Sequence, residues 1–519
     1  MARAKRSRRA DSRRTRTAAA GKIQHVVVLM LENRSFDHIF GYRAGVDGLK
    51  GDEFNLLDPS KPESDSNPSF VVNNGAPYAV LAGNGPGHSL ADTNCQLCND
   101  KGGPSNTLAA SNNGFVRSYY NELFRDHVPS PASNVTAVVM QSFSPAGLPS
   151  LNALADAFCV CDHWYAEVPG PTQPNRFYMH AATSVGAALN NWQRQLDVRT
   201  IYNSIQDAGL TWATYAFDNN EVLEFSQVNQ QSDNFKQYQE AFAVDVNQNT
   251  LANYSFIIPR FLNSKKSSHL TSGLANSQHA PQDARYGDNL IADVYQALRS
   301  NSALWQQSAL IVIYDEHGGF YDHLVPPSGG IPNPDGLNSP QPDAPAWAPQ
   351  FSFNRLGLRV PAVIASPWIK AGTIDSTRYQ HTSVLATLTK MFGLGGFLTK
   401  RDASANTFET LFDQLSAPRN DTPATLRRAA LPKLTVSIND PRHPANLLLN
   451  PDQTQMLLRV YHLTETSHPE GPPVSSLPTT QAEAHDFIQK RYRRHFGRPG
   501  RPGLLPGGRG ERQLRSVRR

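Results

Sequence analysis

Features that mark secreted and membrane proteins are scarce in this sequence. Its 519 residues include only four cysteines, which are too few to stabilise a chain of this length by disulfides. The longest apolar runs fall far short of the about 20 residues that a membrane-spanning helix requires. The arginine pairs at 8–9 and 13–14 are followed by no apolar stretch that could serve as a secretory signal. A cytoplasmic location is therefore the default expectation, and the chain is long enough to bury a large core.

The four cysteines form two short pairs. Cys95 and Cys98 make one C-x-x-C, and Cys159 and Cys161 flank a single valine. A zinc site built from all four is disfavoured because C-x-C is a poor ligand spacing, and His163 stands nearby without a second histidine. We expect buried or loop thiols, with one local disulfide between Cys95 and Cys98 as the alternative.

Positive charge is confined to the two ends of the chain. Residues 1–24 contain nine Lys and Arg against one acid, and residues 487–519 contain eleven against one. The stretch between them, 25–486, has 29 basic and 42 acidic residues, so that the body is acidic although the whole chain carries a formal charge of +5. We expect the tails to be solvated and disordered. The alternative is a weak attraction to anionic surfaces, and no specific nucleic-acid site is expected.

Apolar runs of strand length alternate with helix-like segments. A helix is expected over 288–298, where apolar residues recur near the helical period. This alternation predicts an α/β fold with a mostly parallel sheet covered by helices on both faces. The candidate strands are 25–31, 211–215, 254–258, 309–314 and 361–366.

Two long segments rich in Pro, Gly, Asn and Ser separate these elements. Residues 44–114 and 325–359 are too long to be ordinary connections, so functional loops or disorder are expected there. The second segment could form a wall of a substrate cleft or a surface excursion. Both readings remain open at this point.

Polar clusters follow two of the candidate strands directly. Glu32 and Asn33 come after the first apolar run, and Asp315 and Glu316 come after the fourth. Open α/β sheets bind ligands beyond the carboxyl ends of their strands, so these four side chains should meet at one edge. Their hard oxygen atoms suit a divalent cation better than a thiolate-binding metal. Helix capping could explain either cluster alone, but two such clusters favour the cation site.

A threonine between prolines lies between these clusters. Segment 168–176 reads VPGPTQPNR, in which the prolines restrict the backbone on either side of Thr172. A helix is expected to begin near Asn175. A hydroxyl beside a metal ion can act as a nucleophile because the Lewis acid stabilises its alkoxide. The alternative is a structural turn in which Thr172 caps that helix.

Five motifs that follow one another along the chain carry a family resemblance. They are 32–38 with Gly41, 169–172 with 174–176, 315–319 with 322–323, 359–361 with 366–368, and 381–383. Over residues 23–420 the chain resembles the bacterial phospholipase C and acid phosphatase phosphoesterases, which are related to the alkaline-phosphatase fold. The resemblance implies an alkaline-phosphatase-like α/β domain with long active-site loops over 23–420. Basic tails at 1–22 and 497–519 and a C-terminal extension at 421–496, ending in a helix, would flank or follow it.

The resemblance also implies roles for individual residues. A divalent metal ion, of open identity and number, would be surrounded by Glu32, Asn33, Thr172, Asp315 and Glu316. Thr172 would attack phosphorus and form a phosphothreonine intermediate. The histidines that contact the phosphoryl group correspond to His88, His279 and His323. Either His279 or His323 would protonate the leaving alcohol or orient the phosphoryl oxygens.

The expected function is a metal-dependent phosphoric ester hydrolase of phospholipase C type. Its substrate would be a phosphate ester, with phospholipids among the candidates. A broad-range acid phosphatase and a catalytically idle protein that binds phosphate or anionic surfaces are the alternatives. Two departures from the family are visible: a cleavable export signal, common in similar proteins, is not seen, and a cysteine pair follows His88.

Overall fold

The computed structural model describes most of the chain. The described residues are 21–80, 82–98, 110–128, 133–191, 195–230, 232–265, 273–340, 350–465 and 476–495. The two basic tails lie outside these ranges, apart from residues 21 and 22. Within the described residues, no helix combines the length and the apolar character needed to cross a membrane.

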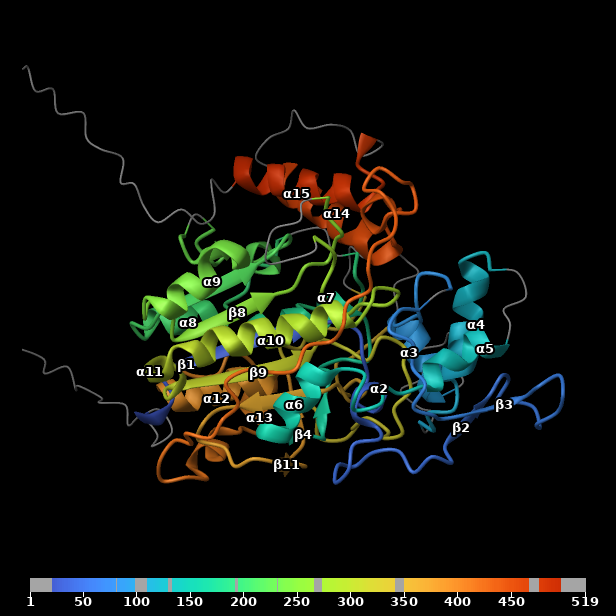
Figure 1. Cartoon of the computed structure of the whole chain (residues 1–519), viewed down its shortest axis with the longest axis horizontal. Coiled ribbons are helices and arrows are strands. Elements are labelled where there is room, and N and C mark those ends of the chain that lie inside the picture. Colours follow the sequence, from blue (N-terminus) through green and yellow to red (C-terminus); the bar gives the residue numbers. More distant parts are fainter. Residues whose placement is uncertain are drawn as a thin grey trace, which may run out of the picture.

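An eight-stranded sheet forms the centre of the described chain (Figure 1). In spatial order its strands are β11 (Thr373–Asp375), β4 (Cys159–Cys161), β10 (Ala362–Ala365), β9 (Ser308–Tyr314), β1 (His25–Leu31), β8 (Tyr254–Ile258), β6 (Trp212–Ala216) and β7 (Phe235–Gln237). Of these eight strands, only β10 runs against its neighbours, β9 and β4, and the other seven share one direction. The mostly parallel sheet expected from the sequence is therefore confirmed.

Two small sheets accompany the central one. The strands β2 (Phe54–Leu56) and β3 (Ser69–Val71) form an antiparallel pair, and β5 (Trp164–Tyr165) pairs in parallel with β12 (Tyr379–Gln380). Both pairs lie outside the eight-stranded sheet.

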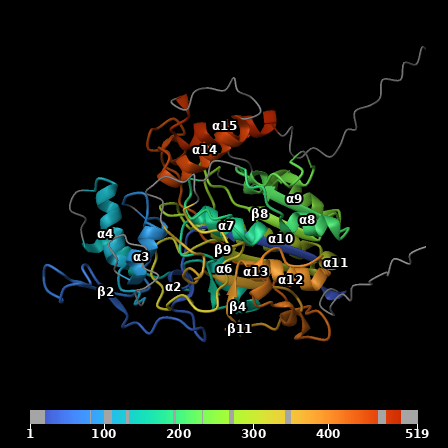
Figure 2. The same ribbon diagram turned by 180° about the vertical axis from the view of Figure 1, so that it is seen from behind.

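Helices cover the central sheet on both faces. On one face, α10 packs against α6, α9 and α11 in the foreground of Figure 1, and on the other α7 packs against α8 and α12 in the foreground of Figure 2. The described helices are α2 (Phe36–Phe40), α3 (Leu90–Cys98), α4 (Phe115–Arg125), α5 (Ser133–Thr136), α6 (Pro149–Ala157), α7 (Thr172–Ala181), α8 (Ile201–Asp207), α9 (Tyr238–Asn247), α10 (Arg285–Ser300), α11 (Ser302–Trp305), α12 (Thr382–Phe392), α13 (Lys400–Ser404), α14 (Pro451–Glu465) and α15 (Gln481–His495).

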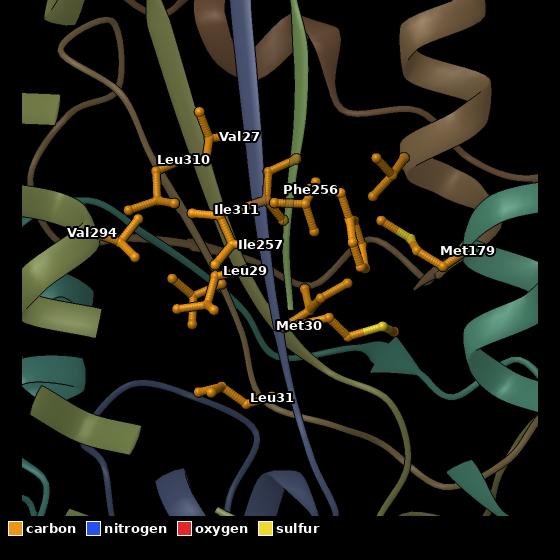
Figure 3. Packing of buried hydrophobic residues seen from close by; sticks show 14 of the residues in the cluster. Val27, Leu29, Met30, Leu31, Met179, Phe256, Ile257, Val294, Leu310 and Ile311 are labelled. Atoms are coloured by element: carbon orange, nitrogen blue, oxygen red, sulfur yellow. The ribbon is translucent and has the colours of Figure 1, made fainter. Parts of the chain in front are cut away.

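The apolar run that forms β1 is buried on both of its faces. Figure 3 shows Val294 of α10 and Met179 of α7 on opposite sides of this strand. Residues 26–31 are all buried, which explains why the run is continuously apolar instead of alternating. Burying one Leu, Ile or Val side chain stabilises the fold by about 1.5–3 kcal/mol, so this strand anchors the sheet. The ends of β1 and of its neighbour β9 are thereby held in a fixed relation.

The expected elements agree with the structure except in two respects. The first and third candidate strands have the bounds of β1 and β8, and the helix expected over 288–298 lies within α10. The helix expected to begin near Asn175 begins at Thr172 instead. Pro174 does not interrupt it, because backbone N–H groups in the first turn of a helix have no partner within that helix. The strand expected over 361–366 is β10, whose antiparallel direction was not foreseen.

The described parts of the first long segment, 44–114, include β2, β3 and α3. Together with α4 and residues of the loop after β9, they form a second apolar cluster that includes Phe70, Leu97, Phe115 and Phe320. The four cysteines, all in the described part of the chain, form no disulfide, and the alternative of a Cys95–Cys98 bridge is therefore wrong.

The C-terminal extension packs closely on the rest of the chain. Its first residues run along α10, where the Tyr295 hydroxyl donates a hydrogen bond of 2.6 Å to the carbonyl of Pro423. Farther on, α14 and α15 lie side by side at one end of the molecule, coloured red in Figures 1 and 2. Met456 of α14 and Ile488 of α15 belong to the same apolar cluster as the central sheet. The extension is thus part of a common core.

Candidate active site

Three distant segments meet at the carboxyl ends of β1 and β9. These strands are paired in register, with Leu31 beside Tyr314, so the polar pairs that follow them emerge next to each other. The backbone N–H of Asn33 donates to Oδ1 of Asp315 over 3.0 Å. The hydroxyl of Thr172 donates to Oδ1 of Asn33 over 3.3 Å. The convergence expected from the sequence is therefore present in the fold.

A tight backbone contact fixes the turn after β1. Asn33 has a left-handed conformation, with φ of 60°, which asparagine tolerates better than most residues. Gly318, which follows β9, also has a positive φ, and a Cβ atom there would lie 2.1 Å from the carbonyl oxygen of Asn33. Only glycine lets the two chain segments approach so closely.

Asn175 holds the loop that carries Thr172. Its side-chain oxygen accepts a hydrogen bond from the N–H of Val168, at 3.0 Å, and its amide donates to the carbonyls of Gly170 and Pro171 at 3.0 and 3.1 Å. The loop is thus tied to the helix that it precedes. Thr172, as the first residue of α7, has a fixed position relative to the sheet.

Arg176, one turn farther along α7, binds the carboxylate that follows β9. Its Nε donates to Asp315 over 2.9 Å, and the same guanidinium donates to Glu221 over 2.9 Å. All three side chains are buried. Burial alone would raise the pKa of Glu221, but Arg176 and His180 lower it to about 2. Arg176 therefore holds Asp315 in place and offsets part of the negative charge of the site.

The carboxylates of the site differ in their affinity for protons. Burial raises the pKa of Glu32 to about 7 and the pKa of Asp315 to about 6. Burial acts in the same sense on Glu316, but the neighbouring His88 and His317 lower its pKa below the usual value. Three buried acidic side chains so close together are costly unless positive charge compensates them.

The residues present fit a divalent cation. Oε1 of Glu316 is buried and has no hydrogen-bond partner among the described residues, which is expensive for a carboxylate oxygen that binds nothing. Glu32, Asn33, Thr172 and Asp315 add further oxygen atoms, and oxygen is the ligand that Mg²⁺ and Ca²⁺ prefer. A cation at this place would use the orphaned oxygen and stabilise the ionised carboxylates.

Two histidines lie next to this group. Nε2 of His88 is 3.2 Å from the Asn33 amide nitrogen, and the His88 and His279 rings are 5.5 Å apart. Both Nε2 atoms lie 3.5 Å from Oδ2 of Asp452, a residue in the first turn of α14. The other carboxylate oxygen of Asp452, Oδ1, accepts a hydrogen bond of 2.7 Å from the side-chain amide of Asn190. Burial lowers the pKa of each imidazole, but nearby carboxylates, Asp452 among them, raise both above the usual value. His279, which lines the same cavity as Thr172, can therefore present an N–H donor there, whereas Nε2 of His88 faces the side-chain amide of Asn33.

His323, the third expected histidine, belongs to a different cluster. Its Nδ1 is 2.6 Å from Oδ2 of Asp37, and its Nε2 is 3.2 Å from Asp47. The buried guanidinium of Arg359 bridges Asp37 and Asp322 at 2.9 Å each. Burial lowers the pKa of His323, but Asp37 and Asp322 raise it to about 9. These contacts describe an ion-pair network, and a catalytic role for His323 stays a prediction.

The described chain contains two groups of three acidic and histidine side chains that could hold a metal ion. Within each group, the possible ligand atoms lie within 4.8 Å of one another. One is His88, His279 and Asp452, beside Thr172, and the other is Asp37, Asp322 and His323. Arg359 already provides the positive charge of the second group, which disfavours a cation there.

A narrow cavity of about 40 Å³ opens above Thr172. Its walls include Glu32, His279, and residues of α7 and α14 such as Arg176 and Asp452. No residue of 325–340 or 350–359, the described parts of the second long segment, lines it. The described residues therefore do not support the cleft-wall interpretation for this cavity, and the surface-excursion interpretation does not hold for 350–359 either, because Phe351, Phe353, Leu356 and Leu358 are buried.

Comparison with known proteins shows the family to which this chain belongs. The profile of the Phosphoesterase family matches residues 23–395. The chain belongs to the Phosphoesterase family. It is 36% identical to non-specific phospholipase C3 of Arabidopsis thaliana, over 79% of this chain and 77% of that protein, and 37% identical to non-specific phospholipase C1 of the same plant, over 79% and 75%. It is 30% identical to phospholipase C B of Mycobacterium tuberculosis, over 79% and 82%.

Similarity to solved structures is much weaker. A protein in the alkaline phosphatase superfamily from Vibrio parahaemolyticus is 13% identical, with a TM-score of 0.28 and coverage of 50% of this chain and 64% of that one. The family membership rests on the sequence relatives. This phosphoesterase is a hydrolase that acts on phosphoric ester bonds.

Two side chains of this phosphoesterase site were not assigned a role from sequence. Arg176 lies four residues after Thr172 on α7, and residues four apart lie on the same face of a helix. Its position in the 168–176 segment could therefore have indicated a contact with the carboxylates near Thr172. Asp452 had no comparable signal: the Asn-Pro-Asp stretch at 450–452 indicates only the start of a helix. The profile of the family ends before this helix begins.

Proposed function

We propose that this phosphoesterase is a metal-dependent phospholipase C that cleaves glycerophospholipids to diacylglycerol and a phosphorylated head group. The observation that carries the proposal is the Thr172 hydroxyl, bonded to Asn33 at the meeting point of β1 and β9, with His88 and His279 close by. The plant and mycobacterial relatives are phospholipases C by name, which supports this substrate class.

A divalent cation would be held by the oxygen atoms of Glu32, Asn33, Thr172, Asp315 and Glu316. When bound, it would offset the negative charge that develops on the phosphate oxygens and favour the deprotonated Thr172 hydroxyl. Its identity and number are left open by the donor set, since hard oxygen ligands suit several divalent ions.

Thr172 is the nucleophile of the first step. Its Oγ1 gives its proton to the solvent and forms a bond to phosphorus as the bond between phosphorus and the diacylglycerol oxygen breaks. The leaving oxygen takes a proton from a protonated imidazole, for which His279 is the better placed of the expected donors because it lines the cavity with Thr172. The product of this step is diacylglycerol, and the phosphorylated head group stays on Thr172 as a diester.

Water completes the cycle. A water oxygen forms the new bond to phosphorus and returns a proton to the His279 imidazole, the bond to Thr172 breaks, and the threonine oxygen takes up a proton from the solvent. His88, whose Nε2 lies 3.2 Å from the side-chain amide nitrogen of Asn33, would contact the phosphoryl group in both steps. Arg176 keeps Asp315 oriented throughout.

The test compares three substrates on the purified full chain, before and after removal of divalent ions with a chelator. We expect cleavage of phosphatidylcholine and of p-nitrophenyl phosphorylcholine, loss of both activities on chelation, and recovery on adding a divalent salt. Cleavage of p-nitrophenyl phosphate alone would favour the broad-range phosphatase over the lipase. Full activity after chelation would overturn the metal dependence.

A further inference from the structure

Exposed apolar side chains are concentrated in one stretch of the C-terminal extension. Large hydrophobic residues that stand exposed singly are ordinary on a protein surface, whereas a group of them marks an interaction site. Thirteen are exposed in the described chain, and five of these lie within 431–448. They are Leu431, Leu434, Ile438, Leu447 and Leu448, with exposed fractions from 41% to 71%.

Three of these leucines line a groove that is far larger than the catalytic cavity. The groove has a volume of about 400 Å³, and Leu434, Leu447 and Leu448 share its walls with Tyr286. The buried side chain of Leu274 extends the apolar wall inward. A groove of this size, with leucines at its opening, can accept chains that the catalytic cavity has no room for.

The groove and the catalytic cavity adjoin each other. Gln282 and Gln453 line both of them. Gln453 is fixed between the two by a hydrogen bond of 3.0 Å from its amide to the carbonyl of Phe261. A molecule with a phosphate at one end and apolar chains at the other could therefore reach both at once.

The charge of this stretch is opposite to that of the body. Segment 427–448 contains four Lys and Arg and a single acid, Asp440, although residues 25–486 as a whole carry a net charge of −13. Arg427 and Lys433 are exposed. Positive charge among exposed leucines suits an anionic lipid surface, where both the apolar and the electrostatic contributions favour binding.

We propose that segment 427–448 and the adjoining groove form the surface by which this protein docks on phospholipid aggregates. Acyl chains lie against Leu434, Leu447 and Leu448, while the phosphodiester reaches Thr172 past Gln282 and Gln453. This inference rests on the proposed phospholipase function for its substrate, and it adds the place where the lipid enters.

The test is the double variant Leu447→Ser with Leu448→Ser in the full chain. Its matched control is Leu337→Ser with Phe397→Ser, two exposed apolar residues that line neither cavity. Vesicles of phosphatidylcholine with one fifth phosphatidylglycerol serve for binding, by sedimentation, and for hydrolysis. Soluble p-nitrophenyl phosphorylcholine measures the catalytic centre alone.

We expect the Leu447/Leu448 variant to lose about tenfold or more in vesicle binding and vesicle hydrolysis. Hydrolysis of the soluble ester should stay within about twofold of wild type, because neither leucine lines the catalytic cavity. The control variant should match wild type in every assay. Unchanged vesicle binding, or an equal loss on the soluble ester, would overturn the proposal.

Two further measurements separate this inference from the proposed function. If the wild type binds vesicles through these leucines but cleaves neither ester, the phospholipase assignment fails and the docking surface stands. If the double variant does not fold, Leu434→Ser, at a side chain that is 44% exposed, replaces it in the same assays. Salt should weaken vesicle binding of the wild type, and Lys433→Glu should reduce that dependence. A salt-independent interaction would contradict the electrostatic part.

Discussion

The Thr172 hydroxyl lies 3.3 Å from Oδ1 of Asn33, and this hydrogen bond joins the first turn of α7 to the end of β1. The backbone of Asn33 is itself bonded to Asp315. The direction of the hydroxyl is therefore set by two strand ends and one helix, all anchored in the core, before any substrate arrives. Such a preorganised position is what a nucleophile requires.

Replacing Thr172 by valine should abolish hydrolysis. The change removes the hydroxyl and keeps the branched shape, so we expect turnover to fall by about a thousandfold or more while the fold is unchanged. Thr172→Ser should retain part of the activity because the oxygen is kept. Turnover is measured on p-nitrophenyl phosphorylcholine, and Thr377→Val, at an exposed threonine, is the control. Activity of Thr172→Val near that of wild type would remove the covalent step.

Replacing Arg176 by methionine should destabilise the whole fold. The variant leaves the buried carboxylates of Asp315 and Glu221 without their shared positive partner. Breaking a buried ion pair in this way costs about 3–5 kcal/mol in the free energy of unfolding. Chemical denaturation of the metal-free protein measures it, with Arg199→Met as the control, because Arg199 makes an exposed pair with Asp207. A decrease in the free energy of unfolding no larger than that of the control would show that the ion pairs of Arg176 with Asp315 and Glu221 do not stabilise the fold.

His279 and His323 should differ in what their substitution removes. Since His279 lines the cavity with Thr172, His279→Gln should lower turnover by about a hundredfold or more. His323 is bonded to Asp37 and Asp47, so His323→Gln should lower the melting temperature more than it lowers turnover. Both quantities are measured on both variants. An equal loss of turnover in the two variants would indicate that His323 takes part in catalysis.

Removing the metal should make stability depend on pH. Burial raises the pKa of Glu32 from 4.5 to about 7 and that of Asp315 from 3.8 to about 6. Between these values the native state binds protons that the unfolded chain has lost, so the stability of the metal-free protein falls as pH rises from about 4 to about 7. A bound cation favours the ionised carboxylates and should therefore stabilise more at about pH 8 than at about pH 5. Calorimetry with and without chelator measures both trends, and a metal effect independent of pH would contradict this account.

Much of the fold could be predicted from the sequence because both faces of the central strands are buried. That burial makes β1 and β9 continuously apolar, and their ends are marked by the change to acidic residues. The antiparallel direction of β10 could not be predicted, since composition says nothing about strand direction. The predicted start of α7 is three residues too late, because a proline is expected before a helix, whereas Pro174 lies in the first turn of this one.

The site could be predicted only where its residues follow strands or a distinctive loop. Glu32, Asn33, Asp315 and Thr172 meet this condition. Hydrogen bonds join Asn33 to Asp315 and Thr172, and Glu32 lines the same cavity as Thr172. Asp452 does not, because its contact with the histidines depends on how α14 packs over the cavity. That packing is a property of the tertiary structure, in which a helix from the end of the chain covers residues from its beginning.

The late position of α14 in the chain has a consequence for biosynthesis. The sheet, Thr172 and the two histidines that contact Asp452 are translated before Asp452 itself, since chains are made from the N-terminus onward. A nascent polypeptide thus carries an unfinished centre in which His88 and His279 still lack this carboxylate. The contacts of Asp452 with these imidazoles can therefore form only after translation has reached α14.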